Sequence, residues 1–108
     1  MSFFRIDEQP STEMLPGIDR QAVWLHDVML TFFTFAPGSV VPEHSHDNEQ
    51  ITLVTRGALR FSLDGQTRIL RTGEGVCIPA NMPHSAAALE EPTEAIDAWS
   101  PPRADYKT

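Results

Sequence analysis

The chain has little cysteine, few basic residues and no long apolar run. Its one cysteine, Cys77, excludes a disulfide bond within the chain, and the apolar neighbours Val76 and Ile78 predict a small buried side chain there. Eight Lys and Arg stand against fifteen Asp and Glu, and the net charge of −7 disfavours nucleic acid and anionic lipid surfaces as partners. No segment is apolar over the thickness of a bilayer, and the N-terminus lacks a basic region followed by an apolar stretch. We therefore expect a cytoplasmic protein that binds neither nucleic acid nor membranes.

Short segments of β type dominate the rest of the chain. The 108 residues fit one domain, in which Gly, Pro and Asp turns separate segments rich in β-branched and aromatic residues. Asp64-Gly65 is a strong signal for a two-residue hairpin turn. This spacing predicts an all-β fold, an antiparallel sandwich or barrel. Residues 1–20 are expected to form an N-terminal arm packed on the single domain of residues 21–108. The expected strands are Val23–His26, Val28–Ala36, Ile51–Arg56, Ala58–Leu63, Gln66–Arg71, Val76–Pro79 and Glu94–Trp99.

One expected strand, Val28–Ala36, carries apolar side chains on both faces. Phe32 lies on one face and Phe33 and Phe35 lie on the other, which predicts a strand that is covered on both sides. Together with the aromatic residues near the N-terminus, this strand offers more apolar surface than one small domain can bury. We therefore expect a homodimer.

The histidines carry the clearest chemical signal. His44 and His46 are two positions apart, and in an extended chain such side chains point to the same face. A third histidine, His84, lies on a later Pro-rich turn. Neutral imidazole is the commonest protein ligand of first-row transition metals, and three imidazoles with one oxygen donor would leave positions open for a substrate. The adjacent Glu49 and Gln50 are both candidates for the oxygen donor, and strand parity weakly favours Gln50.

Glycines and histidines together form two motifs that resemble those of the cupin superfamily. The first motif reads Gly38, five residues, His44, one residue, His46, three residues, Gln50, six residues, Gly57, and the second reads Gly73, five residues, Pro79, four residues, His84. The resemblance spans residues 38–88, although cupins usually carry Glu at the position of Gln50. It implies a small antiparallel jelly-roll β-barrel. It also implies one divalent transition metal ion, Ni, Zn, Mn, Fe or Co, held by His44, His46, Gln50 and His84.

Gln50 in place of a carboxylate changes the chemistry that such a site would support. A neutral amide leaves the charge of a bound metal uncompensated, which favours Lewis-acid catalysis over oxygen activation. The alternative is that Gln50 is only a hydrogen-bonded polar residue and that the site holds no metal. His26 lies outside both motifs and is assigned no role.

A second cluster of functional residues lies near the C-terminus. Asp97 and Trp99 share one face of an expected strand, and Pro101-Pro102 stiffens the chain directly before Arg103. An arginine binds a carboxylate with two hydrogen bonds, an aromatic ring stacks on a sugar, and a carboxylate transfers protons, so the group suits an anionic sugar. The alternative is that these are solvated charges near a chain end.

Residues 44–50, which read His-Ser-His-Asp-Asn-Glu-Gln, and the C-terminal residues 97–106 together resemble the KdgF group of single-domain cupins, which act in pectin degradation. Residues 97–103 read Asp-Ala-Trp-Ser-Pro-Pro-Arg, and the group carries Phe at the position of Trp99. The resemblance implies an enzyme that converts 4,5-unsaturated uronates from pectin or alginate into linear 5-keto-4-deoxyuronates. Asp97 and Arg103 would be catalytic, and Trp99 and Arg103 would bind the substrate. The alternatives are a non-catalytic cupin that binds a sugar or another small ligand, and a metal-dependent dioxygenase.

Overall fold

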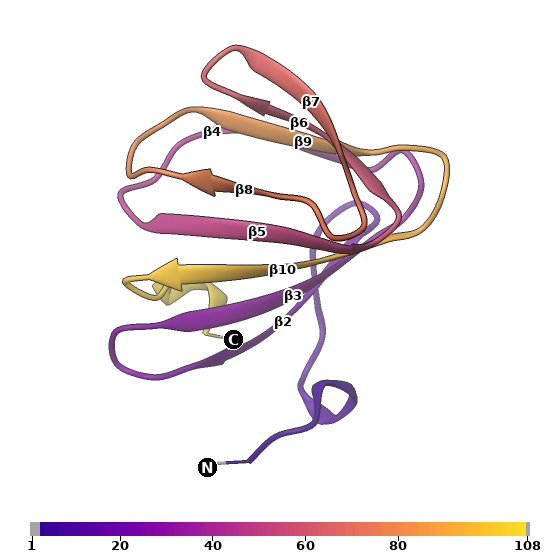
Figure 1. Cartoon of the computed structure of the whole chain (residues 1–108). Helices are drawn as coiled ribbons and strands as arrows, with labels where there is room; N and C mark the ends of the chain where they lie inside the picture. Colours follow the sequence, from indigo (N-terminus) through magenta and orange to yellow (C-terminus); the bar gives the residue numbers. More distant parts are fainter. Residues whose placement is uncertain (1–2, 108) are drawn as a thin grey trace.

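Antiparallel strands make up most of the protein, for which a computed structural model describes residues 3–107 (Figure 1). Residues 1, 2 and 108, the outermost ends of the predicted arm and domain, lie outside this range. The strands are β1 (Thr12–Leu15), β2 (Ile18–Trp24), β3 (Met29–Phe35), β4 (Val40–His44), β5 (Glu49–Arg56), β6 (Ala58–Leu63), β7 (Gln66–Arg71), β8 (Gly75–Ile78), β9 (His84–Ala88) and β10 (Thr93–Ser100). Two short 3-10 helices, η1 (Ile6–Glu8) and η2 (Ala104–Tyr106), lie near the ends, and no helix among residues 3–107 is long and apolar enough to cross a membrane.

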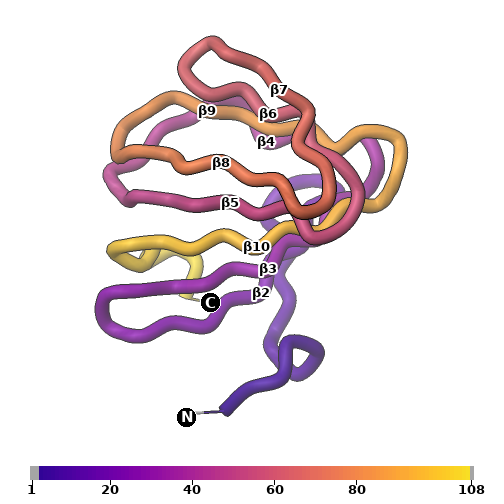
Figure 2. Tube along the Cα trace, in the orientation of Figure 1, coloured from indigo at the N-terminus to yellow at the C-terminus, as the bar shows by residue number. Residues whose placement is uncertain are grey.

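The strands form two sheets that face each other. The larger sheet has the order β1-β2-β3-β10-β5-β8, and the smaller sheet has the order β4-β9-β6-β7. β10, the last strand, lies between β3 and β5, so the C-terminal part of the chain enters the middle of the larger sheet (Figure 2). The predicted all-β fold, a small antiparallel jelly-roll barrel, is confirmed.

Local sequence explains some of these strands better than others. β6 and β7 have the predicted bounds, and the turn between them is the predicted hairpin, with positive φ at Asp64 (48°) and Gly65 (83°). β1, β4 and β9 were not predicted, because Pro42 interrupts β4 and alanines of low β propensity fill β9. Pairing with their neighbours makes these segments strands. The segment before residue 21 contains η1, β1 and the start of β2, and the domain boundary after residue 20 stays a prediction.

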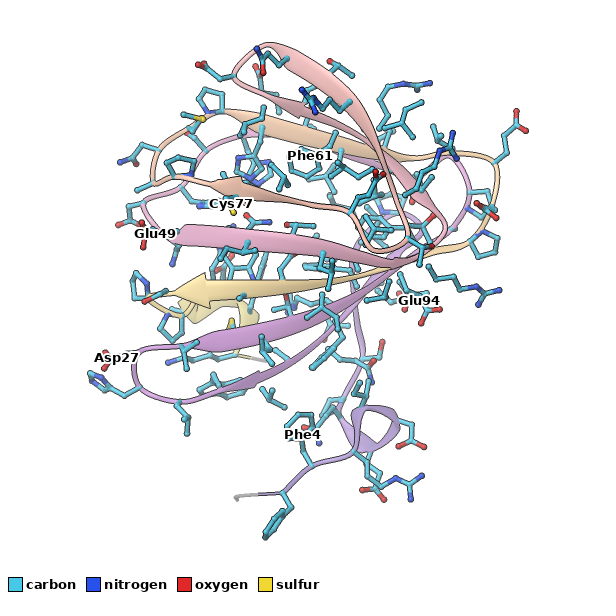
Figure 3. All side chains as sticks on the ribbon, in the orientation of Figure 1. Phe4, Asp27, Glu49, Phe61, Cys77 and Glu94 are labelled. Carbon is cyan, nitrogen blue, oxygen red and sulfur yellow. The ribbon has the colours of Figure 1, made fainter. Side chains whose placement is uncertain are left out.

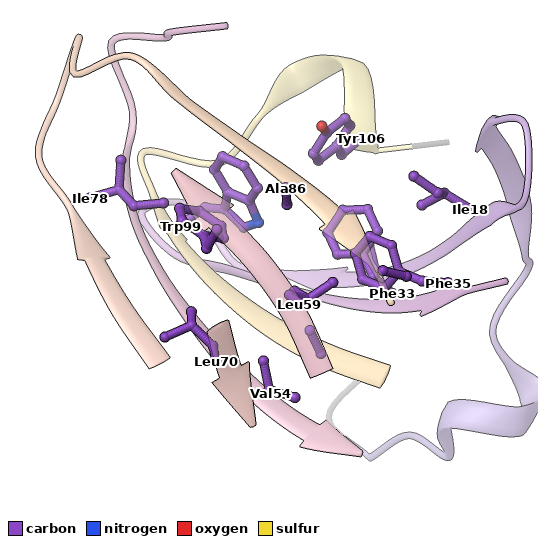
Figure 4. Close-up of a cluster of buried hydrophobic side chains, with 14 of the residues drawn as sticks. Ile18, Phe33, Phe35, Val54, Leu59, Leu70, Ile78, Ala86, Trp99 and Tyr106 are labelled. Carbon is purple, nitrogen blue, oxygen red and sulfur yellow. The ribbon is translucent and has the colours of Figure 1, made fainter. Parts of the chain in front are cut away.

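The barrel interior is apolar at one end and polar at the other. Along β5 and β10, alternate side chains are buried, as expected for strands with one face toward a core. Val54 and Ala95 are buried at the apolar end, where Figure 4 labels Val54. The buried ring of Phe61 (Figure 3) stacks on that of His84, with 6.1 Å between the ring centroids. Gln50 and Asp97 lie toward the other end. The chain therefore places polar side chains on the buried face of two central strands, where burial without a partner costs free energy.

Cys77 is exposed, and the prediction of a buried cysteine is wrong. It lies on β8, an edge strand in which the side chain of Ile78 is buried. Neighbouring side chains of a strand point to opposite faces, so Cys77 points out of the barrel (Figure 3). Val76 and Ile78, the neighbours of Cys77 in the sequence, lie on the inner face of β8, so their apolar character does not describe the face on which Cys77 lies.

The outer face of the larger sheet is apolar and only partly covered. Phe32 on β3 is half-buried, and the ring of Phe4 from the N-terminal segment lies 6.3 Å from it. The inner face of β3 is therefore buried, and its outer face is only partly covered. By register, Ile96 of β10 lies between Phe32 and Leu53 of β5, which forms a continuous apolar row. Leu53 is 44% exposed and its neighbour on the same face, Ile51, is 55% exposed.

We propose that a second copy of the chain covers this face in a homodimer. The N-terminal segment covers only the β3 side, and two identical copies related by a twofold axis would bury the same apolar row on each partner. Light scattering at micromolar concentration should give the mass of a dimer, and Leu53→Glu, which places a charge in the row, should give a monomer. A monomeric wild-type protein would contradict the proposal.

Candidate active site

Three histidines meet at the polar end of the barrel. His44 ends β4, His46 follows in the next loop, and His84 begins β9, where it pairs with His44. One ring nitrogen from each histidine lies within 4.8 Å of the others. The arrangement brings together two segments that are about forty residues apart in the sequence, as the two motifs predicted.

Backbone carbonyl groups fix the orientation of all three rings. In each histidine, Nδ1 lies within hydrogen-bond distance of the carbonyl oxygen of a residue two positions away. The pairs are His44 with Pro42 at 2.9 Å, His46 with Asn48 at 3.0 Å, and His84 with Met82 at 2.9 Å. A carbonyl oxygen only accepts, so Nδ1 carries the proton and Nε2 presents a lone pair. This is the way in which proteins orient histidines that bind metals.

Gln50 completes the group from β5. It is buried, whereas Glu49 points outward (Figure 3). Its Nε2 donates to Thr52 Oγ1 at 2.9 Å and to Asp97 Oδ2 at 3.0 Å, which leaves Oε1 facing His46 Nε2 at 3.0 Å. Both of these facing atoms are acceptors when His46 is neutral, and two acceptors at this distance repel unless a cation or a proton lies between them.

The donor set therefore fits a metal ion. His84 Nε2 is buried and has no hydrogen-bond partner among residues 3–107. Burial lowers the pKa of His46 and of His84, and the positive charge of Arg103 acts in the same direction on both. Neutral imidazoles bind metals and protonated ones do not. Three imidazole nitrogens and one amide oxygen suit a divalent transition metal.

Asp97 lies next to this group on the buried face of β10. It is 6% exposed, and its Oδ1 has no hydrogen-bond partner among the described residues, whereas Oδ2 accepts from Gln50. Burial raises the pKa of Asp97 to about 7, although hydrogen bonds from Thr52 and Gln50 act in the opposite direction. A carboxyl group that titrates near neutral pH inside a pocket is suited to proton transfer.

Trp99 forms a wall of the same pocket. It is 3% exposed, its ring centroid lies 5.1 Å from that of His46, and its Nε1 donates to Thr31 Oγ1 at 2.9 Å. The hydrogen bond fixes the indole in one orientation. Asp97 and Trp99 share the inner face of β10, as predicted.

Arg103 lies beside Trp99, just after β10. Its Cζ is 5.4 Å from the centroid of the Trp99 ring, and its side chain is 19% exposed. Its Nε and Nη2 donate to the carboxylate of Asp105 at 3.2 and 2.9 Å. A guanidinium group has five N–H donors, so this pair leaves donors for a ligand.

The pocket also contains residues that were not predicted. Thr52, Phe33 and Tyr106 line it together with His44 and His84. Thr52 lies two residues after Gln50 on the same strand face, so its position could have been inferred by parity. Tyr106 follows a polar segment near the chain end, which gives no such signal. His26 is exposed in the turn between β2 and β3, where its Nδ1 lies 2.9 Å from Asp27 Oδ1, and it does not line the pocket.

The sequence and the fold match proteins that are already known. Residues 31–99 match the cupin domain family. The chain is 37% identical to the pectin degradation protein KdgF of Dickeya dadantii over 106 residues, which are 96% of each chain. It superimposes on the structure of KdgF from Halomonas sp. with a TM-score of 0.91, at 36% identity and over 97% of both chains. An RmlC-like cupin from Shewanella frigidimarina shares the fold with a TM-score of 0.93, at 24% identity, over 98% of this chain and 96% of the other.

Proposed function

The chain belongs to the cupin family, and from this premise we propose that the protein is a metal-dependent enzyme of pectin or alginate breakdown. It opens the ring of 4,5-unsaturated uronates, small anionic sugars, and produces linear 5-keto-4-deoxyuronates. The observation that carries the proposal is the position of Asp97. Its buried carboxyl group accepts a hydrogen bond from Gln50, and its Oδ1 has no hydrogen-bond partner among residues 3–107. Similarity to KdgF proteins over the whole chain supports the same reading.

The residues that would hold the metal are His44, His46, His84 and Gln50. A divalent ion bound there, Ni, Zn, Mn, Fe or Co, would act as a Lewis acid and stabilise negative charge that develops on an oxygen of the substrate. The apolar lining of the pocket, which includes Phe33 and Phe61, excludes water and strengthens electrostatic interactions inside it.

Asp97 would move the proton that starts the reaction. The substrate is a cyclic hemiacetal whose ring oxygen also belongs to an enol ether. When a base removes the proton of the anomeric hydroxyl group, a carbonyl group forms at C1 and the bond between C1 and the ring oxygen breaks. The enolate that is released takes up a proton at C4 and becomes a ketone at C5. The ionised Asp97 accepts this proton through Oδ1, and its pKa of about 7 allows it to release the proton again at neutral pH.

Arg103 and Trp99 would bind the sugar. The guanidinium group would donate to the substrate carboxylate, and Trp99 would shape the wall against which the ring lies.

The direct test measures how fast a lyase-generated unsaturated uronate loses its conjugated double bond. The ultraviolet absorbance of that bond is recorded with and without the protein, so that the enzymatic rate is compared with the rate of spontaneous ring opening. Elemental analysis of the same sample identifies the metal. Protein with metal bound should open the ring faster than the spontaneous reaction. Metal-loaded protein that does not exceed the spontaneous rate would refute the proposal and favour a cupin that binds a ligand without catalysis.

Arg103→Ala should raise KM and lower kcat/KM by about 10- to 100-fold, because it removes charge-assisted hydrogen bonds to the substrate. Steady-state kinetics with the same assay measures the change. Arg68→Ala, which removes an exposed arginine of β7, is the matched control and should leave both constants unchanged. An unchanged KM for Arg103→Ala would exclude its role in substrate binding.

A further inference from the structure

The segment after β10 turns back toward the pocket that Trp99 lines. We call residues 101–106 the C-terminal strap; it contains Arg103 and ends in η2. Arginine has a long side chain with many rotamers, and fixing it in one of them costs free energy when a ligand binds. A strap that is fixed before the substrate arrives would reduce this cost.

Asn48 fixes the beginning of the strap. It is 7% exposed, and its Nδ2 donates to the carbonyl oxygen of Pro101 at 2.7 Å. The backbone carbonyl of the same residue accepts from His46 Nδ1. Asn48 therefore connects the loop that contains His46 to the strap that contains Arg103. Its main-chain carbonyl group contacts the histidine, and its side chain contacts the strap.

Tyr106 fixes the end of the strap. It is buried, and its ring meets Trp99 edge to face at 5.4 Å (86°) and Phe33 at 6.2 Å (77°) (Figure 4). The Cζ atom of Arg103 lies 4.4 Å from the centroid of the Tyr106 ring. A guanidinium group at this distance over an aromatic ring is held by cation–π attraction, which is stronger where water is excluded.

We propose that Tyr106 and Asn48 are positioning residues, which hold the strap at its two ends and keep the Arg103 guanidinium beside Trp99. This inference rests on the proposed function, in which Arg103 binds the substrate carboxylate. It assigns a role to two residues outside the predicted site, and both act through Arg103 and not on the reacting atoms.

Tyr106→Leu keeps an apolar side chain and removes the ring. KM should rise about three- to tenfold, with a smaller change in kcat and unchanged metal content, because the guanidinium group loses the surface on which it rests. Tyr106→Phe keeps the ring and should restore KM. Leu70→Ala, a truncation in the core away from the pocket, is the control for general destabilisation and should leave KM unchanged.

The decisive comparison is the double variant Tyr106→Leu with Arg103→Ala. If Tyr106 acts through Arg103, the double variant should have the KM of Arg103→Ala alone, since residues that share one interaction are not additive. A full additional rise of KM in the double variant, or an equal rise in Leu70→Ala, would overturn the proposal.

Asn48→Ala provides a second variant if Tyr106→Leu does not fold. It removes the donor to Pro101 but keeps the carbonyl group that His46 needs, so KM should rise while the metal stays bound. Loss of metal with unchanged KM would show that Asn48 serves the histidine loop only, against the proposal.

A readout that needs no substrate separates this inference from the proposed function. The Nε–H resonance of Arg103 in a nitrogen-15 spectrum, assigned with Arg103→Ala, should move toward the position of an exposed arginine in Tyr106→Leu and stay near its wild-type position in Tyr106→Phe. A resonance that does not move in Tyr106→Leu rejects the positioning role. If the wild-type protein opens no ring, the proposed function fails, and this spectrum still decides whether Tyr106 holds Arg103.

Discussion

Asp97→Asn should lower kcat by about 10²- to 10⁴-fold while metal stays bound, which is the usual contribution of general acid–base catalysis. The amide has the shape of the carboxyl group and can still accept from Gln50 Nε2, so the pocket keeps its geometry. It cannot accept the proton of the anomeric hydroxyl group. KM should therefore change much less than kcat. The measurement is steady-state loss of the conjugated double bond, with metal content determined on the same sample.

The pH dependence provides an independent check on Asp97. Burial raises its pKa to about 7, so the carboxylate that accepts a proton is formed as the pH rises through that range. In the wild-type protein, kcat/KM should increase with pH and level off above the pKa, and a nearby cation moves this limb to lower pH. The limb should be absent in Asp97→Asn. If Asp97→Asn is active and keeps the wild-type pH profile, Asp97 is not the base of the reaction.

His84→Ala should abolish metal binding and activity together. It removes one of four donors and, because His84 is 3% exposed, no neighbouring side chain or solvent molecule replaces it easily. Metal content should fall to roughly a tenth of one ion per chain or less after dialysis, and the rate should approach that of the spontaneous reaction. His44→Ala and His46→Ala should behave in the same way.

His26→Ala is the matched control for the histidine variants. His26 is exposed and lies beside Asp27, so its removal should change neither metal content nor rate. Thermal unfolding of all four variants tests whether the fold survives. Full metal occupancy in the variants of His44, His46 and His84 would exclude these residues as ligands.

Periodicity in the sequence was enough to predict which face of a strand many residues occupy. The alternation along β5 separates Gln50 from Glu49, and the alternation along β10 puts Asp97 with Trp99. Periodicity contains no information about which strands are neighbours. Asp97 reaches Gln50 because β10 pairs with β5, a contact between residues 47 positions apart.

Other features could not be predicted because nearby residues do not determine them. β9 contains three alanines and becomes a strand through pairing with β4 and β6. Tyr106 is buried although the residues before it are polar, because its ring fills space beside Trp99 and Phe33. The register of the edge strand β8 decides which of its faces carries Cys77. That face is exposed, although the apolar neighbours of Cys77 in the sequence predicted a buried side chain.

The carbonyl groups that orient the three imidazoles belong to the main chain. Any residue at positions 42, 48 and 82 supplies the same acceptor as long as the backbone keeps its path, so natural selection can change these side chains without disturbing the histidines. Position 48 illustrates the freedom that results. Its carbonyl group serves His46 whatever side chain it carries, and the asparagine side chain is available to hold Pro101. The proposed metal site and the proposed sugar site can therefore change separately at every one of these positions except 48, where one residue contacts both.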